Sequence, residues 1–355
     1  MRICLVASSR FPIREPFAGG LEAMTHTMAR KLSARGHEVT LFAGPGSDAT
    51  LPVRMLPLDT FEPSAAALAD RFAPGPEWLA EHHAYLGLML DLARSGHDEY
   101  DVIHNNSLHH LPVAMASAVH VPMVTTLHTP PLPFLESALA LDAGGSTFVA
   151  VSEWTSRSWR HVLPSTVIHN GLDLADWPVG PGGGPVVWSG RLVPEKGAHD
   201  AIEACRLAGL PLMLVGPRQD PRYFHDVIEP MLGDGIEYAD HLHQRHVARL
   251  LRSASAALVT PRWDEPYGLV AAEAMACGTP VVGYSRGALP EVVGRDGGVL
   301  VPPGDVAALA AALQHAVRLD RAAVRRRADA TCGADRMIDA YERLYAETAE
   351  ADRAA

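Results

Sequence analysis

Residues 185–208 read PVVWSGRLVPEKGAHDAIEACRLA, in which an apolar run, a tight turn and a helical pattern follow one another directly. Val186–Ser189 is typical of a strand, and Ala198–Ala208 of a helix. A strand that turns into a helix in this way is the repeating unit of a parallel sheet covered by helices. We therefore expect the turn, which carries Arg191 and Lys196, to lie at the carboxyl edge of a sheet, where ligands bind.

The same alternation of short apolar runs and longer helical patterns extends from this unit in both directions. In the first half it predicts helices at Leu21–Ala34, Glu77–Ala93 and Glu153–Val162, and strands at Ile3–Ala7, Glu38–Ala43, Val53–Leu56, Asp101–His104, Pro122–Leu127 and Thr147–Val151. In the second half it predicts further strands at Leu212–Val215, Ile236–Tyr238, Ala256–Thr260, Pro280–Gly283 and Val299–Val301. The pattern indicates an α/β protein with two Rossmann-like, doubly wound domains.

Glycine and proline mark the boundary between the two predicted domains. Residues 170–185 include Asn-Gly, several prolines and three consecutive glycines, a composition typical of a linker that buries no core. We therefore expect a domain over 1–170, a linker over 171–185 and a domain over 186–333. The final segment, 334–355, is amphipathic and needs an apolar surface to cover.

The stretch from Leu58 to Gly96 is long for a connection between strands. It carries Trp78, His82, His83 and Tyr85, and its helical part is expected to cover the first domain. Packing is the favoured role of these side chains, over a role in lining an acceptor groove.

Composition excludes several classes of function. The 355 residues carry a net charge of -11, which offers no positive field for nucleic acid, and we expect at most a peripheral contact with a membrane. The four cysteines have no CxxC spacing, which argues against a disulfide scaffold or a zinc site. No apolar run reaches the length of a transmembrane helix, and the run at residues 1–7 is too short for a signal peptide. These features predict a cytoplasmic protein.

The segment 265–278, EPYGLVAAEAMACG, carries two glutamates eight residues apart. Pro266 fits the first turn of a helix, whose free amides would seat a phosphate or sugar oxygen. Two carboxylates repel phosphate but accept hydrogen bonds from hydroxyl groups. We expect Glu265 before the helix and Glu273 in its second turn, facing different parts of one extended ligand. Without other evidence, two glutamates with no ligand are an equal alternative.

Two basic residues in the turn after Ser189 change that balance. Arg191 offers a planar fork for phosphate oxygens, and Lys196 a compact charge, so together they could neutralise a departing diphosphate. The alternative is a surface ion pair between Lys196 and Glu195. The chain has only two lysines, Lys31 and Lys196, and this scarcity favours the phosphate role.

Weaker signals come from glycines and histidines. Gly19 and Gly20 precede a predicted helix and would let backbone amides approach a phosphate, although the chain has no GxGxxG motif. His128 follows a predicted strand and is a candidate for the cleft; a structural role is as well supported. His104 has a similar position and a weaker claim. A metal site at His241, His243 and His246 is disfavoured because no carboxylate or cysteine has suitable spacing.

Other catalytic motifs are missing, because the chain has no GxSxG, GxxxxGK[ST] or HExxH. The motifs that it does have resemble those of glycosyltransferase family 4. Glu265 to Glu273, followed by AMACGTPVV, looks like that family's E-x7-E signature, and SGRL at 189–192 with Lys196-Gly197 resembles its donor-phosphate motif. Residues 169–173, 19–22 and 298–302 also fit, so the resemblance covers nearly the whole chain except 58–96.

The resemblance implies a GT-B fold, with two Rossmann-like domains facing a cleft and a C-terminal helix that crosses back onto the first domain. Matching positions imply a role for each predicted site residue. Arg191 and Lys196 would bind the donor diphosphate, which Gly19 and Gly20 would approach from the first domain. Glu273 would hold the ribose, and His241 would lie near the nucleobase. The sugar would be held by Glu265 with the amides of Tyr267, Gly268 and Leu269, and His128 would contact it near the reacting carbon.

The resemblance also implies transfer of a hexose-type sugar to an acceptor hydroxyl, with retention and without a metal or other cofactor. A UDP donor is favoured over a GDP donor. The hypothesis is a front-face reaction in which the leaving diphosphate accepts the proton of the acceptor. The alternatives are an epimerase or phosphorylase on the same fold, and a catalytically silent subunit that binds the nucleotide sugar. The acceptor is not predicted.

Overall fold

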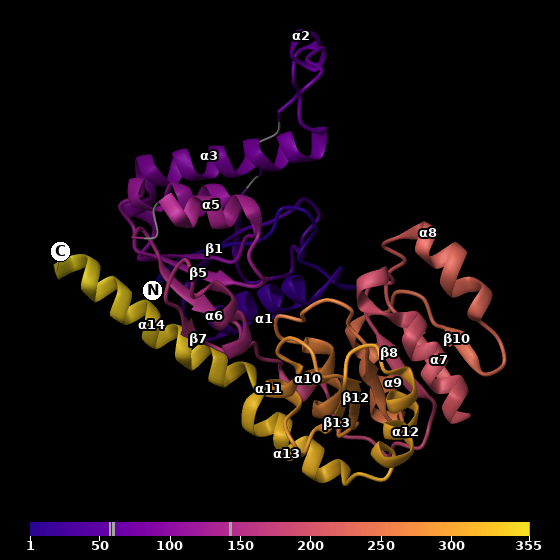
Figure 1. Ribbon diagram of the computed structural model, residues 1–355. Coiled ribbons are helices and arrows are strands. Elements are labelled where there is room, and N and C mark those ends of the chain that lie inside the picture. The colour runs from indigo at the N-terminus through magenta and orange to yellow at the C-terminus, as the bar shows by residue number, and fades with distance from the viewer. Residues whose placement is uncertain (57, 59–60, 142–143, 355) are drawn as a thin grey trace.

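The computed structural model describes residues 1–56, 58, 61–141 and 144–354. The described residues form two parallel sheets of seven and six strands, each with helices on both faces. Figure 1 shows the two halves beside each other, with the last helix, in yellow, running back along the first half. The predicted class, an α/β protein with two doubly wound sheets, is confirmed.

The first sheet has the strand order β3-β2-β1-β4-β5-β6-β7. Ile3 at its centre lies opposite Val39 on one side and Val102 on the other. Strands β2 and β3 lie on one side of β1, and the next strands in the sequence, from β4 onward, lie on its other side. The carboxyl ends of β1 and β4 therefore flank the crevice where such sheets bind ligands. The strands are β1 (Arg2–Val6), β2 (Glu38–Phe42), β3 (Arg54–Leu56), β4 (Val102–Asn105), β5 (Met123–Leu127), β6 (Thr147–Ala150) and β7 (Thr166–Val167). The two-residue β7 was not predicted.

The helices of the first half pack on opposite faces of this sheet. Ile3 and Leu5 of β1 face one core, which is shared with α1 and the last helix, α14. Cys4 and Val6 face the other core, which is shared with α3. The helices are α1 (Gly20–Ala34), α2 (Ala65–Leu68), α3 (Pro76–Glu99), α4 (His110–Ala114), α5 (Pro133–Leu141) and α6 (Glu153–Trp159). Helix α3 runs past its predicted end at Ala93 and includes the buried Gly96.

The second sheet repeats this arrangement, with the order β10-β9-β8-β11-β12-β13 and its reversal between β8 and β11. The strands are β8 (Val186–Ser189), β9 (Leu212–Val215), β10 (Ile236–Tyr238), β11 (Ala257–Val259), β12 (Val281–Tyr284) and β13 (Gly298–Val301). The helices are α7 (Ala198–Ala208), α8 (Pro221–Tyr223), α9 (Gln244–Ser253), α10 (Leu269–Ala276), α11 (Leu289–Val293), α12 (Val306–Ala316), α13 (Arg321–Thr331) and α14 (Ala334–Ala354). The strand and helix around the opening motif, β8 and α7, have the predicted bounds.

The stretch between the sheets is packed rather than free, so the prediction that it buries no core is wrong. Trp177 is 1% exposed and, with Leu172, belongs to a core of the second half. The amide of Leu172 also donates to the carbonyl of Cys332 at 2.7 Å, and the amide of Ala334 donates to the carbonyl of Leu172 at 2.8 Å. Proline and glycine spacing did not reveal these tertiary contacts. The domain boundaries at 170 and 186 stay a prediction.

Helix α14 is joined to the first sheet by a buried polar network. His104 is fully buried, and its ring nitrogens lie 2.6 Å from Tyr345 Oη and 2.8 Å from Thr126 Oγ1. Tyr341 Oη lies 2.9 Å from the same Thr126 hydroxyl. Burial lowers the pKa of His104 to about 3, so the ring is neutral. His104 therefore joins the helix to the sheet and does not line a cleft. Within the described part of the chain, no helix is long and apolar enough to span a membrane.

Candidate active site

A cleft of about 1270 Å³ lies between the carboxyl ends of the two sheets. The loops after β1, β5, β8, β9, β10 and β11 all contribute to its walls. All eleven predicted site residues line this one cleft: Gly19, Gly20, His128, Arg191, Lys196, His241, Glu265, Tyr267, Gly268, Leu269 and Glu273. The structure thus brings the predicted residues together, while their individual roles stay predictions.

Lys196 and Glu265 form an ion pair on the wall of the second sheet. Lys196 Nζ lies 2.6 Å from Glu265 Oε2, and the two side chains are 19% and 14% exposed. The indole Nε1 of Trp263 donates to the same carboxylate oxygen at 3.1 Å, and Lys196 Nζ lies 4.9 Å from the centre of the Trp263 ring. The expected alternative, a pair between Lys196 and Glu195, is not formed. Both side chains of this part-buried pair line the cleft, so each can exchange its partner for a polar group of a bound ligand.

A buried hydroxyl fixes the two loops that carry this pair. Thr260, directly after β11, donates to the carbonyl of Gly197 at 2.8 Å. The same hydroxyl accepts from the Nε1 of Trp188 on β8 at 3.1 Å. Thr260 is 1% exposed, so the network is shielded from water. The loop with Lys196 is therefore held against the loop that leads to Glu265.

Arg191 lies on the same wall, in the loop directly after β8. Its Nη1 donates to Gln219 Oε1 at 3.2 Å, a neutral contact. Arg191 forms no ion pair with a described carboxylate, although its charge partly opposes the rise that burial causes in the pKa of Glu22 across the cleft. The planar fork therefore remains suited to bind an anion.

The start of helix α10 differs from the prediction. Pro266 is not in its first turn, because the helix begins at Leu269 with Gly268 as its N-cap. Gly268 has φ +92°, a left-handed conformation that cannot continue a right-handed helix towards Pro266. The carbonyl of Pro266 instead accepts hydrogen bonds from Ser152 Oγ at 2.6 Å and Thr155 Oγ1 at 3.1 Å, across to the first half. Among the described residues no side chain caps α10, which leaves its first amides open towards the cleft.

Glu273 lies in the second turn of α10, as predicted, and lines the cleft. Burial raises the pKa of its carboxyl to about 8, and no charge or hydrogen bond from a described residue opposes that shift. A part-buried carboxyl without a partner is costly unless a ligand supplies donors. Sugar hydroxyl groups are donors of that kind.

The start of helix α1 faces the start of α10 across the cleft. A Cβ on Gly20 would lie 2.8 Å from Leu269 Cδ1, so a larger residue at position 20 would displace the end of the Leu269 side chain. The N-cap of α1 is Gly19, which has no side chain, and the backbone amides of Gly19 and Glu22 interact with the Glu22 carboxylate. Glu22, in the first turn, is 5% exposed, and burial raises its pKa. Glu22 is a cleft residue for which the sequence indicated no separate role.

His128, which follows β5, is oriented by a residue that sequence reasoning missed. Its Nε2 lies 2.9 Å from Asn106 Oδ1, at the end of β4, while Asn106 Nδ2 lies 4.0 Å from Met28 Sδ. This arrangement has Nε2 donate to the Asn106 oxygen and leaves Nδ1 as an acceptor. Burial lowers the pKa of His128 to about 3, so the imidazole is neutral. The adjacency of strand ends β4 and β5 could have suggested this partner.

The loop between β1 and α1 reaches across to the second half of the chain. His241 Nε2 lies 2.9 Å from the carbonyl oxygen of Phe17. Glu15 Oε2 lies 3.2 Å from His243 Nδ1 and accepts from the amide of Gln244 at 3.1 Å. His241 thus lines the cleft, as predicted, and also joins the two halves.

A second set of contacts joins the halves beside α6. Glu291 accepts hydrogen bonds from the amides of Glu153 at 2.9 Å and Trp154 at 3.3 Å, at the start of α6. The same carboxylate lies 2.5 Å from His169 Nε2. A carboxylate at the start of a helix is favourable because the helix amides point at it. The two halves therefore meet through two separate sets of polar contacts.

Comparison with known proteins gives matches over both halves. Residues 182–331 match the family model "Glycosyl transferases group 1", and residues 18–176 match the model "Glycosyltransferase Family 4". The glycogen synthase of Mycobacterium tuberculosis is 32% identical over an alignment of 381 positions, which covers 93% of this chain and 89% of the relative.

Two solved structures have a similar fold along the whole chain. Sucrose-phosphate synthase from Thermosynechococcus elongatus superimposes with a TM-score of 0.80 at 21% identity, covering 98% of this chain and 99% of the other. Anabaena Alr3699/HepE in complex with UDP and glucose gives 0.74 at 21% identity, again covering 98% and 99%.

The two facing sheets, the cleft and these matches define a glycosyltransferase with the GT-B fold. The chain belongs to glycosyltransferase family 4.

Proposed function

We propose that this glycosyltransferase moves a hexose from a nucleotide-diphosphate sugar to an acceptor hydroxyl with retention of configuration and without a metal ion at the reacting atoms. The observation that carries the proposal is the close grouping of the Lys196–Glu265 pair, the uncapped start of α10 and the unpartnered Glu273 on one wall. The ion pair suits a diphosphate and a sugar, the start of α10 suits a phosphate or sugar oxygen, and Glu273 suits a ribose.

The donor would exchange partners with the ion pair as it binds. Lys196 turns from Glu265 to the diphosphate, and Arg191 adds its planar fork to the same oxygens. Glu265 is then free to accept hydrogen bonds from the sugar, while the open amides at Leu269 face its remaining oxygens. Glu273, ionised once hydroxyl groups donate to it, holds the ribose.

Transfer then needs positioning and charge stabilisation rather than a protein nucleophile. The bond from the anomeric carbon to the diphosphate oxygen breaks as the bond to the acceptor oxygen forms on the same face. The acceptor proton goes to the departing diphosphate oxygen, whose charge Lys196 and Arg191 stabilise. Glu265 and Glu273 do not act as an acid and base pair, because each holds a different part of the donor.

UDP is the proposed nucleotide, since the Anabaena structure of the same fold contains UDP and glucose. Glucan is the first acceptor to test, since a relative is a glycogen synthase. The net charge of -11 and four buried, unpaired cysteines favour a cytoplasmic enzyme with at most peripheral membrane contact.

The test is a transfer assay with a panel of UDP- and GDP-sugars, with and without glycogen, in the presence of EDTA. We expect the release of nucleoside diphosphate to depend on the acceptor. Proton NMR should show an α-linked product from an α-linked donor. A β-linked product contradicts retention, and activity that EDTA abolishes contradicts metal independence. A donor converted to its epimer without acceptor indicates an epimerase, and binding without any turnover indicates a silent subunit.

A further inference from the structure

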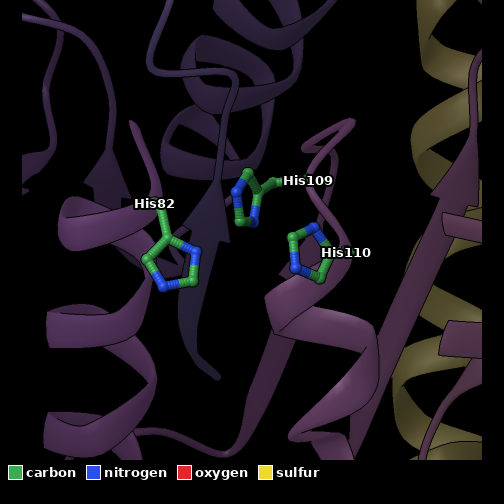
Figure 2. Close-up of side chains that lie close together, drawn as sticks. All are labelled: His82, His109 and His110. Atoms are coloured by element: carbon green, nitrogen blue, oxygen red, sulfur yellow. The ribbon is translucent and has the colours of Figure 1, made fainter. Parts of the chain in front are cut away.

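Three histidines outside the proposed donor site gather between α3 and α4. His82 lies on α3, His109 is the N-cap of α4, and His110 is its first residue. Figure 2 shows the three rings close together in the space between these elements. Their ligand nitrogens all lie within 4.8 Å of one another. In a zinc site each such nitrogen lies about 2.0–2.1 Å from the metal ion, so the three nitrogens would have to move closer together when the ion binds.

Two of these ring nitrogens are buried without a partner. His82 Nδ1 and His109 Nε2 are enclosed and make no hydrogen bond within the described part of the chain. His109 as a whole is only 7% exposed. Buried polar atoms are normally satisfied, so two orphans on neighbouring rings point to a shared missing partner.

The protonation state of the rings suits a cation. Burial, reinforced by the adjacent imidazoles, lowers the pKa of His109 to about 3 and also lowers that of His110. Neutral imidazole is the form that ligates metals. Nδ1 of His109 now accepts from the amide of Leu111 at 3.2 Å, and binding through Nε2 would move the ring proton to Nδ1 and cost this bond. Metal coordination has to outweigh that loss.

Aromatic neighbours hold the rings in place. Trp78 stacks on His82 with 4.9 Å between ring centres, Tyr85 on His109 with 4.6 Å, and Phe134 on His110 with 5.4 Å. An apolar shell of this kind limits solvent access and restricts ring orientation. Stacking alone would explain the aromatic contacts but leaves both buried nitrogens unsatisfied.

We propose that His82, His109 and His110 bind one divalent transition-metal ion, with Zn²⁺ the best fit, as a three-histidine site completed by water. Imidazole is a preferred ligand of zinc, copper and nickel, whereas magnesium and calcium prefer oxygen. The ion would join α3 to the start of α4. Because Glu77, Trp78 and Glu81 of α3 line the cleft, the ion would stiffen one wall without touching the reacting atoms.

The test uses the full chain without a histidine tag, freed of metal by a chelator and then dialysed. Titration with Zn²⁺ by calorimetry should give one equivalent of tight binding, and Co²⁺ should give visible absorption bands typical of nitrogen ligation. Saturating Zn²⁺ should raise the melting temperature by several degrees, because the ion binds the folded state. Absence of tight binding, or binding without a shift in melting temperature, contradicts the proposal.

Two variants and a control locate the ion. We expect H110Q to weaken Zn²⁺ binding by more than about tenfold and to abolish the Co²⁺ bands. H82F keeps a ring to stack on Trp78 and should give the same loss, so a folding defect in one variant does not confound the result. H120A, which removes an exposed histidine of the same half, should bind as the wild type does. Equal affinity in H110Q, H82F and the wild type overturns the site.

The same variants show whether the loss of metal binding also affects sugar transfer. H110Q should keep wild-type transfer rates at 25 °C, with and without EDTA, if the ion is structural. Loss of transfer in H110Q with normal donor affinity would show that the ion acts in turnover, which contradicts the structural role.

Discussion

The two walls of the cleft are built alike but present groups of different charge. On the wall of the second sheet, Lys196 and Glu265 come from loops after adjacent strands β8 and β11, and Glu273 follows on the helix directly after. On the wall of the first sheet, Asn106 and His128 likewise follow two adjacent strands, β4 and β5. The second wall holds charged groups, whereas His128 and its partner Asn106 are neutral.

This difference in charge indicates a different function for each wall. Fixed charges next to an uncapped helix are suited to hold a diphosphate and to stabilise its departure. A neutral imidazole held by an amide is suited to orient a sugar hydroxyl with little change in net charge. The second wall should therefore govern donor affinity and departure, and the first wall should govern orientation.

The largest effect is expected for K196A. Removing the cation that faces the diphosphate should lower kcat/KM about 10²–10³-fold and weaken donor binding. Steady-state kinetics with a saturating acceptor measures it. The matched control is K31A, the other lysine of the chain, which pairs with Asp335 and Asp173 away from the cleft. Near-normal turnover in K196A, or equal losses in both variants, would contradict the role of the second wall.

A smaller effect on binding is expected for E273Q. Loss of the charged acceptor should weaken donor affinity about tenfold, with kcat reduced less than affinity. Calorimetric titration with the donor measures the change. Unaltered affinity would mean that Glu273 does not face the donor.

The same substitution has a pH-dependent effect on stability. The folded-state pKa of about 8 lies above the ordinary value of 4.5, so the wild type loses stability as the pH rises from about 4.5 to about 8. E273Q removes this loss and should be more stable than the wild type at pH 8.5, with no gain near pH 4. Urea unfolding at both pH values measures the difference; an equal gain at both would show that burial of the Glu273 charge is not its cause.

The smallest effect on donor binding is expected for N106L on the first wall. Without an acceptor for its Nε2 proton, His128 loses a fixed orientation, and kcat should fall about tenfold while donor affinity changes less than about twofold. N106D restores an acceptor and should recover part of the rate, with a pH–rate profile shifted because a carboxylate raises the pKa of the ring. A loss of donor affinity in N106L as large as that in E273Q would remove the distinction between the walls.

Sequence reasoning predicted the second wall better than the first for a physical reason. Lys196, Glu265 and Glu273 lie in short motifs at strand ends, and strand ends of a parallel sheet meet at one edge whatever the rest of the chain does. The position of Glu273 in the second turn followed from helix periodicity alone. The start of α10 was misplaced because the left-handed Gly268 and the hydroxyl contacts to Pro266 are tertiary features.

The features that sequence did not reveal depend on packing between distant segments. Asn106 and His128 meet because β4 pairs with β5, and no motif in the sequence marked Asn106 as a site residue. His82 and the pair His109–His110 come from different helices and carry no metal-site spacing. The burial of Trp177 in the stretch predicted as a linker likewise needs the second core to be assembled.

Donor titration of the variant set tests the central claim most directly. The wild type, K31A, K196A, E273Q and N106L are titrated by calorimetry with UDP-glucose and with other UDP- and GDP-sugars. We predict that one nucleotide sugar binds the wild type, K31A and N106L with similar affinity, binds E273Q about tenfold more weakly, and binds K196A more weakly still. A nucleotide sugar that binds all five proteins equally would contradict a donor seat on the second wall.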